Sequence, residues 1–162
     1  MRLLMWLAAL VLAAANFMAV LDMTVANVSV PSIAGNLGAT TSQGTWVITS
    51  YAVAEAIAVP LTGWLAARFG AVRVFATAMG LFGLASLLCG LAWNTPMLIA
   101  SRVFQGASGG AMLICLVAVL SHQFPQGAER SRAFSTWGVM LGIGLGFRPL
   151  IGGMIVALSD WR

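Results

Sequence analysis

Long apolar runs alternate with short polar breaks along this chain. Runs of about 18 or more apolar residues are typical of membrane-spanning helices. We expect five such helices, over about 4–33, 43–66, 72–92, 97–120 and 133–158. The breaks between them have turn chemistry, and Pro96 is well placed for the first turn of the fourth helix. The pattern predicts an all-α integral membrane protein with one transmembrane domain over residues 1–162.

The composition agrees with this prediction. Hydrophobic residues make up 60% of the 162 residues and charged residues 7%, whereas a soluble domain has about 25% charged residues. The net charge of +4 comes from scattered arginines without a basic face, so we expect the lipid bilayer as a partner and no nucleic acid. Cys89 and Cys115 lie in apolar runs without CxxC spacing, which favours small core hydrophobes. The residues indicate no cofactor and no metal site.

The arginines predict the orientation of the chain. Five of them, Arg2, Arg68, Arg73, Arg130 and Arg132, lie at the N-terminus and in the second and fourth connections. The first and third connections contain no Lys or Arg, and only Arg162 lies beyond the fifth run. By the positive-inside rule, we expect a multi-pass protein of the cytoplasmic (inner) membrane with its N-terminus in the cytoplasm.

The first run has a second interpretation. Met1-Arg2, the apolar stretch and Ala13-Ala14-Ala15 resemble a secretory signal peptide with a cleavage site. The apolar stretch continues beyond Ala15, however, which favours a retained helix.

Two charged residues in the apolar runs are expected in the outer half of the membrane. Asp22 would lie roughly 16 Å from the external end of the first helix and Arg102 roughly 9 Å from that of the fourth. A charge at this depth usually faces a bundle interior or a watery cavity and marks an ion or substrate path. We therefore expect an Asp22–Arg102 interaction, direct or through water. The alternatives are an Asp22 wetted at the interface and an Arg102 that extends to the outer surface.

Glu55 and Arg148 form a second candidate pair. Both would lie near the midplane, roughly 15–18 Å from the external side. A mutual ion pair would relieve the burial of both charges, although the sequence does not show that their helices adjoin.

Glycines form two small-residue patches, Gly138, Gly142 and Gly146 in the fifth run and Gly106, Gly109 and Gly110 in the fourth. Small residues at such spacings let helices approach closely, and Pro149 favours a kink in the fifth helix. For the fourth helix we favour ordinary packing.

One serine motif has to be tested for enzymatic function. Gly106-Ala107-Ser108-Gly109 resembles the serine motif of rhomboid proteases, and His122 is the only histidine. A serine–histidine pair needs contact at about 3 Å, whereas these residues lie roughly 21 Å apart along one helix. We therefore predict a protein that is not an enzyme.

Four strings, in order, resemble the major facilitator superfamily, specifically its fourteen-helix drug:proton antiporter branch of the EmrB/QacA type. They are the first-helix string 21–31, the loop string 63–73, the Arg102-Val103-Phe104-Gln105-Gly106 string and the segment 144–153. The string 46–51 also resembles the second helix of this branch, and the match runs from about residue 16 to the last residue.

The resemblance implies multidrug efflux, in which lipophilic, often cationic compounds are exported in exchange for protons. Asp22 would bind the proton or a cationic drug, and Arg102 would take part in proton coupling. The loop with Gly63, Arg68, Gly70 and Arg73 would act as a conformational latch. Gly144, Pro149, Gly152 and Gly153 would form the helix-packing antiporter motif.

The chain departs from the family pattern at two positions and in length. Ala67 stands where the latch motif usually has Asp, and Arg148 stands where a glycine usually precedes the proline. Five helices correspond to a partial N-terminal bundle, because the family places its site between two six-helix halves. We therefore also consider a truncated, non-transporting polypeptide, or a subunit that needs a second polypeptide to supply the missing helices.

Overall fold

The computed structural model describes residues 2–36, 40–124 and 126–147. These residues form five helices, α1 Arg2–Asn36, α2 Thr41–Phe69, α3 Ala71–Gly90, α4 Thr95–Gln123 and α5 Ala128–Gly146, with no strand in the described part of the chain. The all-α prediction is confirmed. Four helices contain segments long and apolar enough to cross a membrane: Met5–Met23, Ser42–Phe69, Ala71–Gly90 and Thr95–Gln123. The end of the predicted fifth helix, 148–158, lies outside the described residues.

Side chains in the connections define where two helices begin. Thr40 and Gln43 form a capping box at α2, in which the Gln43 amide donates to Thr40 Oγ1 at 3.3 Å and the Thr40 amide donates to Gln43 Oε1 at 3.0 Å. Asn94 caps α4 by accepting a hydrogen bond from the Met97 amide at 2.8 Å, and Pro96 lies in the first turn as expected.

The last helix, α5, begins at Ala128, before the expected residue 133. The difference has a local cause in the polar connection. Gly127 adopts a positive φ of 121°, and Arg130 Nε donates to the Phe124 carbonyl at 3.1 Å, while its Nη2 donates to the Ser121 carbonyl. Arg130 thereby satisfies two carbonyls at the C-terminal end of α4, where helical partners are lacking. Glu129, Arg130 and Arg132 thus belong to the first turns of α5.

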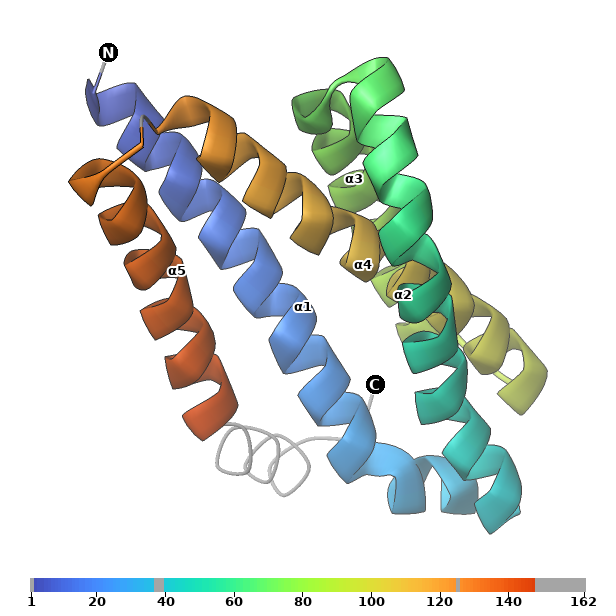
Figure 1. Cartoon of the computed structure of the whole chain (residues 1–162). Helices are drawn as coiled ribbons and strands as arrows, with labels where there is room; N and C mark the ends of the chain where they lie inside the picture. The colour runs from blue at the N-terminus through green and yellow to red at the C-terminus, as the bar shows by residue number, and fades with distance from the viewer. Residues whose placement is uncertain (1, 37–39, 125, 148–162) are drawn as a thin grey trace.

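The helices form two packed groups, α2, α3 and α4 in one and α1 and α5 in the other, and α1 contacts both α2 and α4. Helices α2 and α3 pack against α4, and α5 runs beside α1, as Figure 1 shows. The core contains the fully buried Met112, Cys115 and Leu116 of α4. Near the same end as the N-terminus, Trp6 contacts Phe124 edge to face, with ring centroids 5.2 Å apart. Cys115 therefore packs as a small core residue.

Glycines allow backbone contact where α2 crosses α4. A Cβ atom at Gly106 would lie 2.2 Å from the Tyr51 carbonyl oxygen, and one at Gly110 would lie 2.9 Å from that of Glu55. Both distances are too short for a real side chain, so α2 and α4 can approach this closely only because these positions are glycine. The glycine patch of the fourth helix thus serves helix packing.

The glycines of α5 have different surroundings. A Cβ atom at Gly144 would lie 2.7 Å from Phe17 Cε2 of α1, whereas one at Gly138, Gly142 or Gly146 would meet no atom within 4 Å. Within the described residues, the close contact of α5 therefore involves Gly144 and α1.

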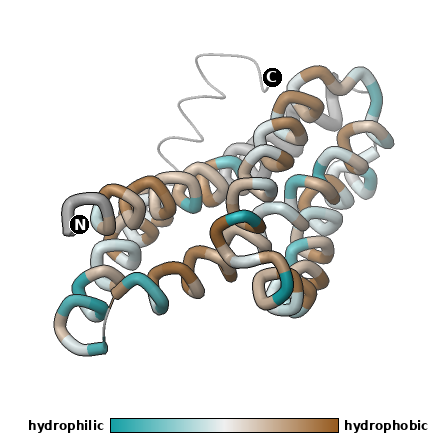
Figure 2. Tube along the Cα trace, turned by 90° about the horizontal axis from the view of Figure 1, so that it is seen from above, coloured by the Kyte–Doolittle hydropathy of each residue, from teal (hydrophilic) through white to brown (hydrophobic). Residues whose placement is uncertain are grey.

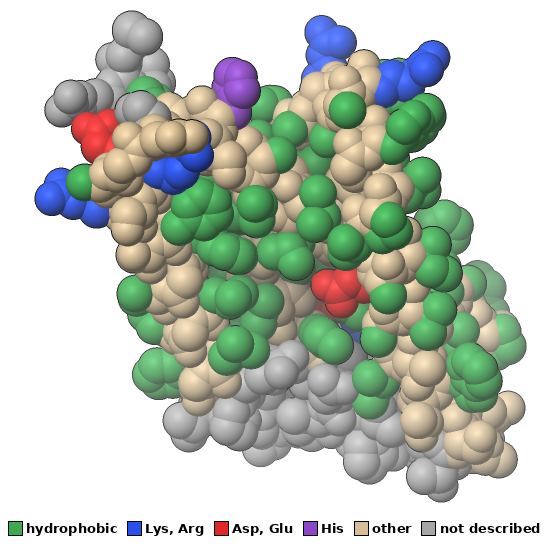
Figure 3. All heavy atoms as spheres, in the orientation of Figure 1, with side chains coloured by type: hydrophobic (Ala, Val, Ile, Leu, Met, Phe, Trp, Pro, Cys, Tyr) green, Lys and Arg blue, Asp and Glu red, His purple; other side chains and the backbone are tan. Residues whose placement is uncertain are grey.

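The surface has the character expected of a protein surrounded by lipid. Large apolar side chains such as Ile57, Trp64 and Leu84 are more than half exposed, and hydrophobic residues recur along all five helices (Figure 2). In the view of Figure 3, arginine side chains lie at the end of the bundle that contains the N-terminus, above a broad apolar surface. This distribution matches a membrane-embedded bundle with one basic end.

Candidate functional site

An ion pair between α1 and α4 lies inside the apolar bundle. Arg102 Nη1 donates to Asp22 Oδ2 at 2.6 Å, and the side chains are 8% and 26% exposed, respectively. Arg102 therefore turns inward instead of extending to the outer interface. The structure thus brings together the two residues that the sequence places in the outer half of the membrane.

A buried amide connects this ion pair to α3. Gln105, which is fully buried, accepts a hydrogen bond from Arg102 Nη1 at 2.7 Å and donates one from Nε2 to Ser86 Oγ at 2.7 Å. The Cys89 thiol also donates to Gln105 Oε1, at 3.5 Å. The guanidinium is therefore held between a carboxylate and an amide, which fixes the orientation of the guanidinium group.

Tyr51 of α2 forms another wall of the site. The Arg102 guanidinium carbon lies 5.8 Å from the centroid of the Tyr51 ring, within the range of a cation–π interaction. Arg102 Nε is buried and has no hydrogen-bond partner among the described atoms. The buried Nε–H of the guanidinium is thus an unused donor in the site.

Glu55 lies one turn after Tyr51 on the same helix. Its side chain is partly buried, and its Cγ atom would lie 3.2 Å from a Cβ atom at Gly110 of α4. Glu55 forms no hydrogen bond or ion pair with any other described residue. Its predicted partner Arg148 lies outside the described part of the chain, as do Pro149, Gly152 and Gly153, so the Glu55–Arg148 pair stays a prediction.

The predicted latch loop forms the tight turn between α2 and α3. Gly70 has a positive φ of 89°, a conformation that favours glycine. Arg68 lies over the rings of Trp64 and Phe69, at 5.7 and 5.8 Å from their centroids. Ala67 is exposed and brings no charge to the turn.

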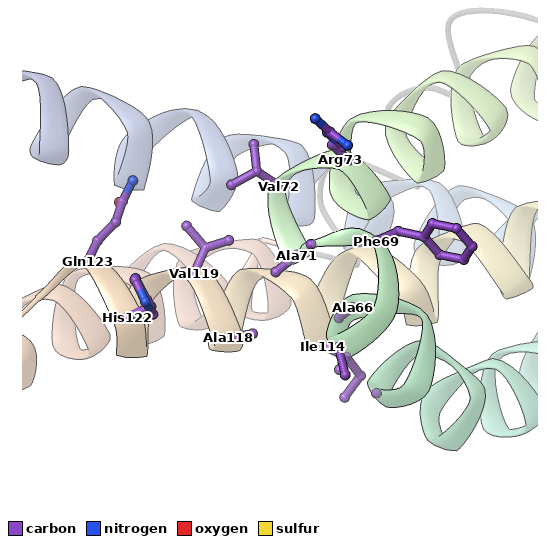
Figure 4. A pocket seen from close by; sticks show the side chains of 13 residues that line it. Ala66, Phe69, Ala71, Val72, Arg73, Ile114, Ala118, Val119, His122 and Gln123 are labelled. Atoms are coloured by element: carbon purple, nitrogen blue, oxygen red, sulfur yellow. The ribbon is translucent and has the colours of Figure 1, made fainter.

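Beside this turn lies a groove of about 870 Å³ that shares no residue with the Arg102 site. Gly63, Gly70 and Arg73 are among its lining residues, as is His122 of α4. Figure 4 shows Arg73 and His122 with other residues that line this groove. The predicted latch residues are thus grouped around one surface groove, with the exception of Arg68, which does not line it.

Comparison with known proteins gives the family. The family model of the Major Facilitator Superfamily matches residues 12–162. The chain belongs to the major facilitator superfamily.

Several proteins similar to this chain are export or resistance proteins. The chain is 46% identical over 152 residues to the multidrug export protein EmrB of Haemophilus influenzae, covering 94% of this chain and 30% of that protein. It is 46% identical over 147 residues to the fatty acid resistance protein FarB of Neisseria gonorrhoeae, covering 91% of this chain and 29% of that protein. It is 36% identical over 157 residues to the puromycin resistance protein pur8 of Streptomyces alboniger, covering 97% and 31%. The chain thus spans about 30% of the length of these curated relatives.

The membrane setting of this superfamily explains why the two charged side chains pair with each other inside an apolar bundle. A major facilitator protein is a multi-pass membrane protein, and the apolar helices found here suit that setting. In such a setting Asp22 and Arg102 avoid lipid by facing each other between α1 and α4. The resemblance inferred from the sequence strings is confirmed by the family match.

The serine motif of this major facilitator chain has a structural use. Ser108 Oγ donates to the Phe104 carbonyl at 2.6 Å and approaches the Gln105 carbonyl at 3.1 Å, within its own helix. His122 lies near the other end of that helix. The two residues do not form a serine–histidine pair.

Sequence reasoning did not assign a role in the site to four residues, Tyr51, Ser86, Cys89 and Gln105. Gln105 carries a usable signal, because it lies one helical turn after Arg102 in an apolar run. Ser86 and Cys89 carry little signal, since such residues are common in membrane helices. Tyr51 is found only when the crossing of α2 over α4 is known.

Proposed function

We propose that this chain supplies the N-terminal helices of a multidrug efflux transporter that exports lipophilic, often cationic compounds in exchange for protons. The supporting observation is the ion pair between Asp22 and Arg102 inside the bundle, in a chain similar to export and resistance proteins. Intramembrane charges that face one another mark ion and substrate pathways. The proposal makes the chain part of a transporter and not of an enzyme, and it needs no cofactor.

In the proposed mechanism, protons and substrate compete for the same negative charge. A cationic substrate is attracted to the ionised site, and protonation of Asp22 removes that attraction and favours substrate release. The positive charge of Arg102 offsets the negative charge of Asp22. The hydrogen bond from Arg102 Nη1 to Gln105 Oε1, at 2.7 Å, holds the guanidinium in position. Proton entry on one side of the membrane is thereby linked to substrate release on the same side.

Two other predicted elements would serve the conformational change. The turn with Gly63, Arg68, Gly70 and Arg73 would act as a latch on the cytoplasmic side, and the groove beside it is where a second bundle would contact it. The antiporter motif with Gly144, Pro149, Gly152 and Gly153 would allow close helix packing. In this arrangement the protein lies in the inner membrane with its N-terminus in the cytoplasm.

The function can be tested in a chimera in which residues 1–162 replace the matching segment of Haemophilus influenzae EmrB. Inside-out vesicles that contain the chimera receive a pH gradient, and uptake of the fluorescent lipophilic cation ethidium is followed. We expect uptake that stops when an ionophore collapses the gradient. Uptake that is equal with and without the gradient would contradict proton coupling.

A further inference from the structure

Gln105 is an amide in the apolar interior of the bundle, and its hydrogen bonds determine how it can lie. The side chain is fully buried in α4, where an amide without partners is costly. Its oxygen accepts from Arg102 Nη1 at 2.7 Å and from the Cys89 thiol at 3.5 Å, and its nitrogen donates to Ser86 Oγ at 2.7 Å. Both ends of the amide thus have partners, and two of these three partners belong to α3.

The chemistry of these partners permits one orientation of the amide. A guanidinium can only donate hydrogen bonds, so Arg102 requires the amide oxygen. The amide nitrogen then points to Ser86, whose hydroxyl oxygen can accept a hydrogen bond. In the flipped orientation, two donors would face each other at Arg102. Ser86 is therefore the acceptor that completes the orientation in which Gln105 can hold Arg102.

Gln105 gives Arg102 an acceptor that does not depend on a proton. Arg102 Nη1 has two acceptors in the described structure, Asp22 Oδ2 at 2.6 Å and Gln105 Oε1. In the proposed mechanism Asp22 binds a proton, and the ionic attraction between the two side chains is then lost. The Gln105 oxygen remains, because an amide does not titrate. Since a long arginine side chain without an inner partner can extend to the outer interface, the amide determines where the guanidinium lies in the protonated state.

The other groups around the guanidinium do not replace this acceptor. The Tyr51 ring attracts the cation through its face, with its centroid 5.8 Å from the guanidinium carbon. Besides Asp22, the titratable groups near the site are Tyr51 and Glu55 of α2 and Cys89 of α3. In the described part of the chain, none of these three forms a hydrogen bond or an ion pair with Arg102.

We propose that Ser86 of α3 is a positioning residue of the transport site. It holds the Gln105 amide with its oxygen toward Arg102, and it thereby keeps the guanidinium inside the bundle while Asp22 is protonated, so that the ion pair re-forms when the proton leaves. Ser86 touches neither the proton nor the substrate and acts through Gln105. The inference rests on the proposed function, and it gives α3 a part in the transport cycle.

The first test measures ethidium uptake by the EmrB chimera in inside-out vesicles at a fixed pH gradient, over a range of ethidium concentrations. Rates are divided by the amount of folded chimera, so that a loss of stability alone does not change them. Ser86→Ala removes the acceptor of the amide, and we expect the maximal rate to fall about tenfold, as for the loss of one buried hydrogen-bond partner. KM should stay unchanged, because the substitution leaves Asp22 in place.

Two further variants separate the hydroxyl from the packing of α3. Ser86→Thr keeps a hydroxyl oxygen at this position and should restore the maximal rate. Thr77→Ala is the matched control, because it removes a hydroxyl of the same helix that donates to the Arg73 and Val74 carbonyls of α3. It should behave as wild type.

The outcomes of this test separate the inference from the proposed function. A wild-type maximal rate in Ser86→Ala, or a reduced rate that Ser86→Thr does not restore, would overturn the inference and leave the proposed function intact. Equal uptake by the wild type with and without the gradient would contradict the proposed function, and the inference with it.

A second measurement follows Arg102 itself and needs no transport. The purified chain in lipid nanodiscs is treated with the arginine reagent phenylglyoxal, and mass spectrometry locates the modified residues, with the exposed Arg68 as the positive control. Asp22→Asn imitates the protonated carboxyl group, and we expect Arg102 to stay protected in this variant as in the wild type. In Asp22→Asn, Ser86→Ala, modification of Arg102 should rise about tenfold, because the amide no longer holds the guanidinium.

The corresponding control is Asp22→Asn, Thr77→Ala, in which Arg102 should stay protected. Modification of Arg102 in Asp22→Asn alone would show that Gln105 does not hold it, and would overturn the inference. Equal protection of Arg102 in Asp22→Asn with and without Ser86→Ala would overturn it as well, because another group would then hold the guanidinium.

Discussion

At the scale of single residues, the site depends on one guanidinium with two acceptors. Arg102 Nη1 donates to both Asp22 and Gln105, at 2.6 and 2.7 Å. Since Gln105 is in turn bound to Ser86 of α3, three helices contribute to the orientation of one charge. Hydrogen bonds in a network of this kind strengthen one another when the site excludes water.

Breaking the ion pair on one side should be more harmful than removing both partners. Arg102→Gln leaves Asp22 without its cation, and we expect a loss of about 3–5 kcal/mol in the free energy of unfolding. The double variant Asp22→Asn, Arg102→Gln leaves no unpaired charge in the pair and should be more stable than Arg102→Gln alone. Helicity measured during unfolding by sodium dodecyl sulfate in mixed micelles provides the values. A double variant at least as unstable as the sum of the single variants would contradict the ion pair.

The sequence predicts part of this site and not the rest. Asp22 and Arg102 could be paired because depth along a helix follows from residue counting. The contacts of Arg102 with Tyr51 and of Gln105 with Ser86 depend on how α2 and α3 are rotated against α4. Residue counting gives the depth of a side chain but not the rotation of its helix, so these contacts required the structure.

At the scale of the helices, glycines determine which surfaces come together. Two glycine patches look alike in the sequence, but their environments differ. On α4, Gly106 and Gly110 meet the backbone of α2, whereas on α5 Gly138 and Gly142 meet no atom within 4 Å. The spacing predicts a face that can approach another helix closely, and only the arrangement of the helices shows which face has a partner.

The crossing of α2 and α4 should be sensitive to a single methyl group. In Gly106→Ala the new Cβ atom would lie 2.2 Å from the Tyr51 carbonyl oxygen, and backbone cannot rotate away as a side chain can. We expect a destabilisation of about 1–3 kcal/mol from overpacking, with a shift of Tyr51 away from Arg102. Gly138→Ala is the matched control, since its Cβ would meet nothing within 4 Å. Unfolding curves of the two variants in mixed micelles test this, and equal stability would contradict the packing described here.

At the scale of the whole molecule, the exposed arginines mark one end of the bundle. Arginines gather at the end of the bundle that contains the N-terminus, in the view of Figure 3. The apolar runs predicted the all-α class, and the positions of the arginines predicted one basic end of the bundle. Both features can be read directly from the sequence. The start of α5 could not be predicted in the same way, since Arg130 and Gly127 draw polar residues into its first turns.

The proposed orientation predicts the outcome of reporter fusions. Alkaline phosphatase, which is active only outside the cytoplasm, is fused after Trp93 in one chain and after Gln126 in another. We expect activity after Trp93, in the connection without arginine, and none after Gln126. Green fluorescent protein at the same sites should give the opposite result. The reverse pattern would place the N-terminus outside the cytoplasm.

The most direct test of the proposed function is the effect of Asp22→Asn on proton-driven export by the EmrB chimera. Asparagine keeps the size of the side chain and removes its charge, which leaves Arg102 without its ionic partner and the site without its attraction for cations. Glu129→Gln, outside the ion pair, is the control, and the amount of protein in the vesicles is matched. We expect ethidium uptake driven by the pH gradient to be lost in Asp22→Asn and retained in Glu129→Gln. Uptake at the wild-type rate in Asp22→Asn would contradict the assignment of proton and substrate coupling to the Asp22–Arg102 site.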